Sequence, residues 1–194
     1  MTHRKGISTG TMCFFIWTRI MFLTIADWID ALNERIGRGV SWLTLFMALV
    51  MFLTVILRYV FNMGWIWMQE SVSFMHGCVF MLAAGYSLLH DEHVRIDIFY
   101  RPMTTRKKGL VNIFGILFLL FPTCYVVLYY AFPYVINSWA VFEGSREAGG
   151  LPGVFLLKTV ILIFAVLLGL QGLSKLIRAF YDVFNTNLAE HSSQ

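Results

Sequence analysis

The sequence predicts an all-α integral membrane protein, in which four transmembrane helices follow an interfacial amphipathic helix and both termini are cytoplasmic. Of the 194 residues, 58% are hydrophobic and only 13% are charged, whereas ordinary soluble domains are about 25% charged. The mean hydropathy is +0.70 over the whole chain, which leaves too little polar surface to cover a water-soluble globule. No internal repeat or Gly/Ser linker divides the sequence, so we expect one domain.

Four segments are long and apolar enough to cross a bilayer. A helix rises about 1.5 Å per residue, so a hydrocarbon core of about 30 Å needs about 20 apolar residues. We expect spans at about residues 42–61, 65–89, 110–132 and 154–177. Each is expected to be helical, because an isolated strand would leave backbone groups unpaired in lipid. They form a membrane domain over residues 41–180, followed by a cytoplasmic tail over 181–194.

The region before the first span shows helical periodicity from Met21. Its apolar residues are Phe22, Ile25, Ile29, Leu32 and Ile36, and its opposite side carries Asp27, Asp30, Glu34 and Arg38. This pattern predicts an amphipathic helix over residues 21–40 that lies in the membrane interface. An ordinary cytoplasmic helix is the alternative. Residues 1–20 form an N-terminal extension that is too short and too interrupted to span.

The basic residues decide the expected orientation. Twelve lie before the first span, between spans two and three, or in the tail, and three lie on the other side of the membrane (Arg58, Arg146 and Lys158). Cytoplasmic loops are enriched in lysine and arginine. We therefore expect both termini and the bridge between spans two and three in the cytoplasm, and the other two loops outside. The positive charge is explained by lipid and topology, and no nucleic-acid motif is present.

The bridge between spans two and three begins with "HDEHVRID", residues 90–97. His90 and His93 are one helical turn apart and have acids beside them, so a metal site is conceivable. A membrane-surface connector is the favoured interpretation, because charges gather where a span leaves the membrane and a base complements a helix C-terminus.

The sequence offers no set of residues for catalysis. It has no C-x-x-C pair, nucleophile–base set, phosphate loop or nucleotide fingerprint. His76 is the only histidine deep in a span, so the chain lacks the second axial ligand of a bis-histidine haem. We expect no enzyme, no cofactor and no metal.

Ionisable residues near the outer ends of the spans carry more information, because lipid makes them costly. Arg58, Glu70 and Lys158 fall in one layer. We hypothesise that Lys158 or Arg58 neutralises Glu70 and locks spans together; snorkelling of both bases to the headgroups is the alternative. Gln171, in the inner part of span four, is expected to bond across helices.

A transporter that works alone would be expected to carry carboxylates near mid-depth or broken helices. The spans hold no such acid, and Pro122 is the mid-span breaker. This pattern favours a supporting subunit.

Short motifs follow one another along the four expected spans. They are Arg58-Tyr59-x-Phe61-Asn62, Trp67-x-Gln69-Glu70, His93-Val94-Arg95-Ile96-Asp97, Ser138-Trp139, Glu143-x-Ser145, Gly150-Leu151-Pro152, Lys158 and Gln171-Gly172. In these motifs the chain resembles the small membrane subunit (DctQ type) of tripartite ATP-independent periplasmic (TRAP) transporters. It departs from the family at Gln69, where many relatives have a second acid.

The resemblance implies a partner-dependent function in a bacterial inner membrane. A periplasmic solute-binding protein (DctP type) would deliver an organic acid, and a large subunit (DctM type) would hold the substrate and sodium sites. The small subunit would be a fixed scaffold. His93, Arg95 and Asp97 would dock the large subunit, and the loop from Pro133 to Gly153, with Trp139 and Glu143, would face the periplasmic protein.

Two rival functions remain open from the sequence. One is a membrane anchor of a respiratory enzyme that binds quinone or haem with another subunit, and His76 is its only support. The other is a small self-assembling exporter, which would need a mid-membrane acid as its coupling site.

Overall fold

The computed structural model describes residues 9–90 and 103–192, and these are helical apart from short connections. The elements are α1 (Thr9–Val60), α2 (Ile66–Leu89), α4 (Thr105–Gly115), the π-helical turn η1 (Ile116–Leu120), α5 (Phe121–Ala140) and α6 (Val154–Ser192). Four helical stretches are long and apolar enough to cross a membrane: Ile20–Val60, Ile66–Leu89, Arg106–Ala140 and Val154–Tyr181. The predicted four-span helical architecture is therefore confirmed, while His93, Arg95 and Asp97 lie outside the described residues.

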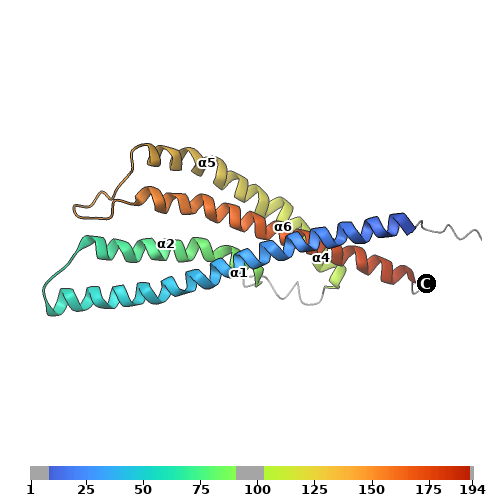
Figure 1. Cartoon of the computed structure of the whole chain (residues 1–194), viewed down its shortest axis with the longest axis horizontal. Coiled ribbons are helices and arrows are strands. Elements are labelled where there is room, and N and C mark those ends of the chain that lie inside the picture. The colour runs from blue at the N-terminus through green and yellow to red at the C-terminus, as the bar shows by residue number, and fades with distance from the viewer. Residues whose placement is uncertain (1–8, 91–102, 193–194) are drawn as a thin grey trace, which may run out of the picture.

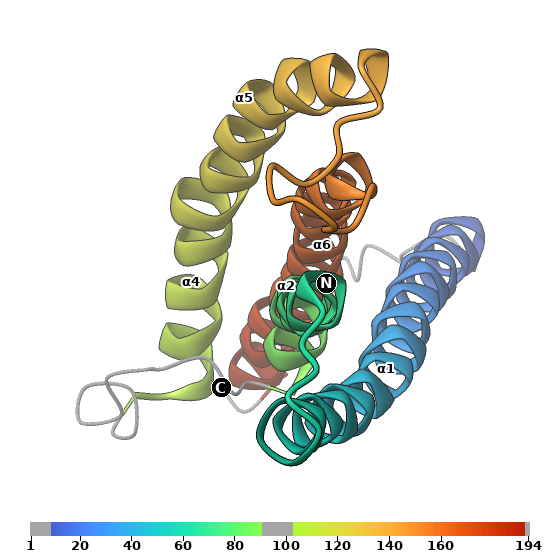
Figure 2. The same cartoon turned by 90° about the vertical axis from the view of Figure 1, so that its left-hand side faces the viewer.

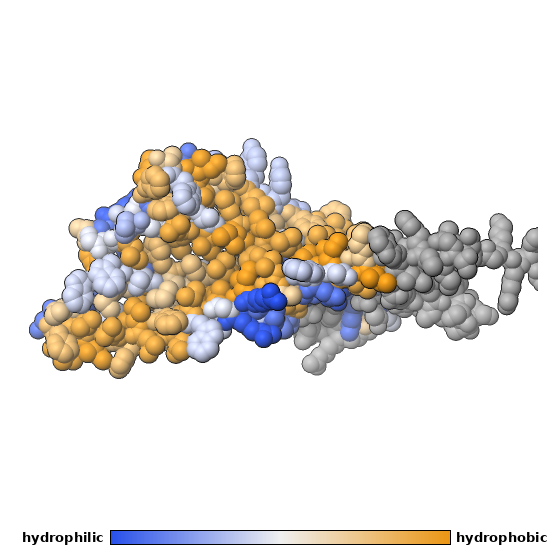
Figure 3. Space-filling model, viewed as in Figure 1, coloured by the Kyte–Doolittle hydropathy of each residue, from blue (hydrophilic) through white to orange (hydrophobic). Residues whose placement is uncertain are grey.

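The helices form an open row rather than a closed bundle. Helix α6 contacts α1, α2, α4 and α5, whereas α1 packs mainly on α2. Figure 2 shows α1 and α5 on opposite sides of the central pair α2 and α6. In each of the first three spans, only 11% of the residues in the most apolar stretch are buried. The corresponding fraction in the span of α6 is 22%. Most of the apolar surface thus faces outward, as Figure 3 shows for one side of the molecule.

Both short connections lie at the same end of the row. Residues 61–65 join α1 to α2 and residues 141–153 join α5 to α6, and Figure 1 places them together, opposite the ends of α1 and α6 that carry the termini. We call these the loop end and the terminal end. Sharing one end is what the predicted topology requires of these two loops.

Helix α1 is far longer than a span. Its 52 residues correspond to about 78 Å, whereas the 24 residues of α2 correspond to about 36 Å. The segment 21–40 is helical, as expected, but runs into the first span without a break. No proline interrupts it, and the extra length packs beside α6, which also extends beyond α2 (Figure 1).

The buried side of this segment is not its most apolar side. Its buried residues are Ala26, Ile29, Asn33, Gly37 and Val40, with Asp30 and Glu34 half-buried next to them. Phe22, Ile25 and Leu32 are exposed. Asp30 and Glu34 therefore face α6 and α2, whereas Phe22, Ile25 and Leu32 face outward.

The third span is longer than predicted and contains two prolines. It was expected over residues 110–132 but continues through Pro133 to Ala140, so the loop expected from Pro133 begins only at Val141. A proline removes one backbone hydrogen bond and crowds the preceding turn. Pro122 lies just after η1, and a π-helical turn is one way a helix accommodates such a disruption.

We expect Gly37→Ala to weaken the contact between α1 and α2. An added Cβ at position 37 would lie 2.7 Å from the Cβ of Tyr86 and closer still to its ring, and overpacking of this kind costs about 1–3 kcal/mol. Gly39→Ala is the matched control, because a Cβ there meets nothing within 4 Å and alanine favours a helix by up to about 1 kcal/mol. Thermal unfolding of both purified variants measures the difference. Equal midpoints would contradict the close approach at Gly37.

Candidate functional site: polar clusters at the two ends of the helical row

At the loop end, Glu70 holds the α5–α6 loop against α2. Its carboxylate accepts hydrogen bonds from Ser145 Oγ and, at 2.6 Å, from the backbone N–H of Leu151. Gly150 lies so close that an added Cβ would be 2.6 Å from Glu70 Oε2. Glu70 is half-buried near the start of α2, just after its first turn, so it fixes the loop to that end of the helix.

A second acid of the same loop joins α5 to α6. Glu143 pairs with Lys158 Nζ and accepts a hydrogen bond of 2.7 Å from Ser138 Oγ. The Lys158 ammonium lies 3.9 Å from the centroid of the Tyr134 ring, and the Trp139 indole N–H donates to Thr159 Oγ1 at 2.9 Å. Lys158 is thus neutralised and enclosed.

Helix α5 ends in a way that places Glu143 for this pair. Phe142 has a positive φ of 44°, its N–H donates to the carbonyl of Trp139, and the N–H of Glu143 donates to the carbonyl of Ser138. These two bonds form a Schellman motif, which normally has glycine at the left-handed position. The chain is thereby turned back over the end of α5, where the carboxylate meets both Ser138 and Lys158.

The expected partner of Glu70 is not the observed one. The hypothesis paired Glu70 with Lys158 or Arg58, but Lys158 pairs with Glu143, and Glu70 uses neutral donors of the loop. Arg58 forms no ion pair within residues 9–90 and 103–192. The hypothesis did not consider Glu143 as a competing acid, because Glu143 precedes Lys158 by 15 residues in the sequence and only the loop brings the two together.

Acid should weaken the link between α5 and α6. The hydrogen bond from Lys158, followed by that from Ser138, holds the pKa of Glu143 below its ordinary value of 4.5. A lowered pKa means that the pair contributes full stability above about pH 4.5 and loses it as the pH falls through the lowered value. We expect the thermal midpoint of wild type to fall more steeply below pH 4.5 than that of Glu143→Gln. Parallel pH profiles from pH 7 to 3 would contradict the pair.

At the terminal end, a buried polar network joins α1 to α6. Gln171 is 1% exposed and Ser174 0% exposed. Asp30 Oδ1 accepts from Gln171 Nε2 at 2.8 Å and from Ser174 Oγ at 2.6 Å, and Asp30 Oδ2 accepts from Arg178 at 2.7 Å. Asn33 completes the network by donating to Gln171 Oε1 at 2.8 Å. Gln171 therefore bonds across helices, within this chain.

Helix α2 closes the network from its other side. Asn33 Oδ1 is buried without a hydrogen-bond partner and lies against Gly85, where an added Cβ would be 3.0 Å from Asn33 Cγ. One turn further, His90 Nε2 lies 2.8 Å from Glu34, which also pairs with Arg38. His90 is the first residue of the charged bridge, and it ties the end of α2 to α1. Among the described residues, no three His, Cys, Asp or Glu side chains gather as a metal site.

Comparison with known proteins identifies the family. Residues 47–182 match the family described as tripartite ATP-independent periplasmic transporters, DctQ component. The chain belongs to the DctQ family. Neither curated proteins nor solved structures gave a significant match. The family match covers the last part of the first spanning helix and all of the other three, and it includes Gln171, Ser174 and Arg178, but Asp30 and Asn33 precede it.

Membership in the DctQ family confirms the resemblance drawn from the short motifs. The chain is a component of a TRAP transporter and, with four helices able to span, a multi-pass membrane protein. In TRAP transporters the DctQ component works with DctM and DctP components. This favours neither a respiratory anchor nor a self-assembling exporter.

Proposed function

We propose that this DctQ-family chain is the fixed scaffold subunit of a TRAP transporter that takes up an organic acid with sodium. One observation carries the proposal: charged side chains are confined to the ends of the spans. Residues 39–57, 71–89, 109–142 and 159–174 contain no Asp, Glu, Lys or Arg. Sodium and substrate sites near mid-membrane would need such groups or broken helices. The polar residues present instead hold helices and loops of this chain together.

The large subunit (DctM type) is the proposed partner within the membrane. An open row of four helices exposes apolar faces that a second membrane protein can cover. On α5, Tyr125, Tyr129 and Tyr130 are 67%, 62% and 70% exposed, and the Tyr129 ring contacts the rings of the other two. Tyr125 lies about 22 Å along the helix from Ala140, deep in the hydrocarbon region. There a hydroxyl finds no acceptor in lipid but can find one on a neighbouring helix.

The proposed setting is the bacterial inner membrane, with the terminal end in the cytoplasm and the loop end in the periplasm. The distribution of lysine and arginine supports this orientation. The 141–153 loop, with Glu143 and Arg146, and Trp139 at the end of α5 would then be available to a periplasmic solute-binding protein (DctP type). The exposed apolar side of residues 21–40, including a Trp28 that is 76% exposed, supports a helix that lies against the inner interface.

Reconstitution tests the scaffold role. We would place the chain, its large subunit, or both in proteoliposomes and measure sodium-driven uptake of labelled organic acids presented with the binding protein. Uptake is expected only with both membrane subunits. Uptake by this chain alone, or full uptake without it, would reject the proposal.

The α5 contact has its own test. A spin label at Tyr129→Cys should lose accessibility to dissolved oxygen when the large subunit is added, because protein replaces lipid around it. The same label at Phe52→Cys on α1, where Phe52 is 65% exposed, reports whether the effect is specific to α5. Unchanged accessibility at position 129 would count against this face.

A further inference from the structure

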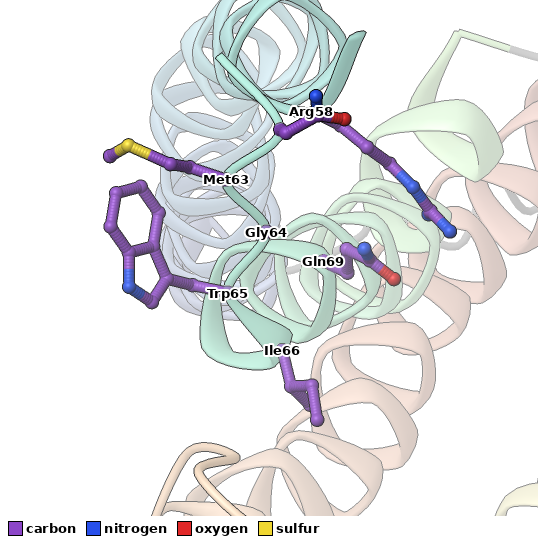
Figure 4. Close-up of a pocket in the computed structure, with 7 residues that line it drawn as sticks. Arg58, Met63, Gly64, Trp65, Ile66 and Gln69 are labelled. Carbon is purple, nitrogen blue, oxygen red and sulfur yellow. The ribbon is translucent and has the colours of Figure 1, made fainter.

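A cavity of about 350 Å³ opens at the turn between α1 and α2. Its walls include Arg58 from the last turn of α1, Asn62 and Gly64 from the turn, and Trp65 and Gln69 at the start of α2. Figure 4 shows Arg58 and Gln69 extending to the same side of the turn from their two helices. Asn62 has a positive φ of 51°, a conformation asparagine tolerates better than most residues, and it reverses the chain tightly enough to bring Arg58 and Gln69 together.

The Arg58 guanidinium is not neutralised by the acids nearby. Glu70 is occupied by Ser145 and Leu151, and Glu143 by Lys158. Arg58 itself makes no hydrogen bond or ion pair with any described residue, and neither does the Gln69 amide. A planar guanidinium with five N–H donors, next to an amide with two more, matches the oxygens of a tetrahedral anion. The cavity is therefore electropositive and rich in donors.

The cavity lies at the depth of lipid headgroups. Tyr59, Phe61 and Trp67 are neighbours in sequence of its lining residues and are 79%, 59% and 47% exposed, and exposed aromatic rings at span ends mark the boundary between hydrocarbon and water. The anion most abundant at that depth is the phosphate of phospholipids. A volume of about 350 Å³ admits a headgroup but not the acyl chains, which would continue along the exposed apolar side chains of α1.

We propose that the cavity at the α1–α2 turn binds a phosphate group, with Arg58 donating two hydrogen bonds to its non-bridging oxygens and Gln69 donating a third. The phosphate is that of a phospholipid headgroup or a free phosphate ion. A bidentate charge-assisted contact of this kind is among the stronger polar interactions. The site rests on the membrane location of the chain and not on its proposed scaffold role.

The test uses the full chain purified in detergent and stripped of lipid. The probes are short-chain phosphatidylglycerol, inorganic phosphate, and a diacylglycerol of the same chain length that lacks phosphate. Binding is followed by native mass spectrometry and by the shift of the thermal midpoint. Wild type should bind phosphatidylglycerol, and Arg58→Gln should bind it at least about tenfold more weakly, as expected for loss of a hydrogen-bonded charge. Arg58→Lys keeps the charge but loses the planar guanidinium that can donate two hydrogen bonds to one phosphate, so its affinity should lie between those of wild type and Arg58→Gln.

Arg146→Gln is the matched control, because Arg146 is an exposed arginine of the same end but outside the cavity; it should bind like wild type. If wild type binds inorganic phosphate and Arg58→Gln does not, the ion alone is a sufficient ligand. If wild type binds phosphatidylglycerol but not inorganic phosphate, the site is one for lipid headgroups. Equal binding by wild type and Arg58→Gln, or equal binding of diacylglycerol and phosphatidylglycerol, would overturn the proposal. Helix content measured by circular dichroism ensures that a loss is not unfolding.

Discussion

Asp30→Ala is expected to detach the terminal half of α1 from α6 and to lower the free energy of unfolding by about 3 kcal/mol or more. Asp30 is the acceptor for Gln171, Ser174 and Arg178. Without it, an amide that is 1% exposed and a hydroxyl that is 0% exposed lose an acceptor, and each stranded buried donor costs about 1–3 kcal/mol. Equilibrium unfolding in mixed micelles, with SDS as denaturant, measures the loss.

The neighbouring acid provides the control for Asp30→Ala. Asp27 also pairs with Arg178, at 2.6 Å, but its side chain is 67% exposed, against 18% for Asp30. An exposed pair contributes about 0–1 kcal/mol, so Asp27→Ala should cost little. Asp30→Asn keeps the shape and one acceptor oxygen, and should fall between the two. If Asp27→Ala and Asp30→Ala lowered the free energy of unfolding equally, the contribution of the network would not depend on burial.

The four spans could be predicted because their cause is local. A bilayer requires about 20 consecutive apolar residues in a helix, and each segment meets this requirement through its own sequence, without contacts to distant residues. The same holds for the helical periodicity of residues 21–40. Which side of that helix is buried could not be predicted, because Asp30 and Asn33 find their partners 141 and 138 residues away on α6.

The polar contacts show a similar division. Glu70 and Lys158 were predicted to be costly charged residues near the span ends, and Gln171 to bond across helices, whereas Glu143 was expected to face a periplasmic partner; all four make polar contacts within the chain. Their pairing depends on loop geometry. Glu70 and Lys158 lie near the outer ends of their spans, but the Schellman turn at Phe142 places Glu143 next to Lys158, which therefore pairs with Glu143 and not with Glu70. A signal for the terminal network was present, since Gln171, Ser174 and Arg178 recur at spacings of three and four, one face of a helix.

Glu70→Ala is expected to free the 141–153 loop while leaving the helices in place. The Leu151 N–H, bonded to Glu70 at 2.6 Å, should exchange with solvent deuterium at least about tenfold faster, since a hydrogen bond to a charged group contributes about 1.5–3 kcal/mol. Gly150→Ala should have the same direction, because its Cβ would intrude on Ser145 and Glu70. Glu147→Ala, an exposed acid of the same loop, is the control and should leave the exchange unchanged.

Lys158→Met decides whether the two acids of the loop end act separately. Lys158 contacts Glu143 and Tyr134, whereas Glu70 is held by Ser145 and the backbone of Leu151. The substitution should lower the thermal midpoint, because it strands Glu143, yet the Leu151 N–H should keep its slow exchange. If the Leu151 N–H exchanges as fast as in Glu70→Ala, the lysine supports both carboxylates. That result would favour the direct pairing of Glu70 with Lys158 that the sequence suggested.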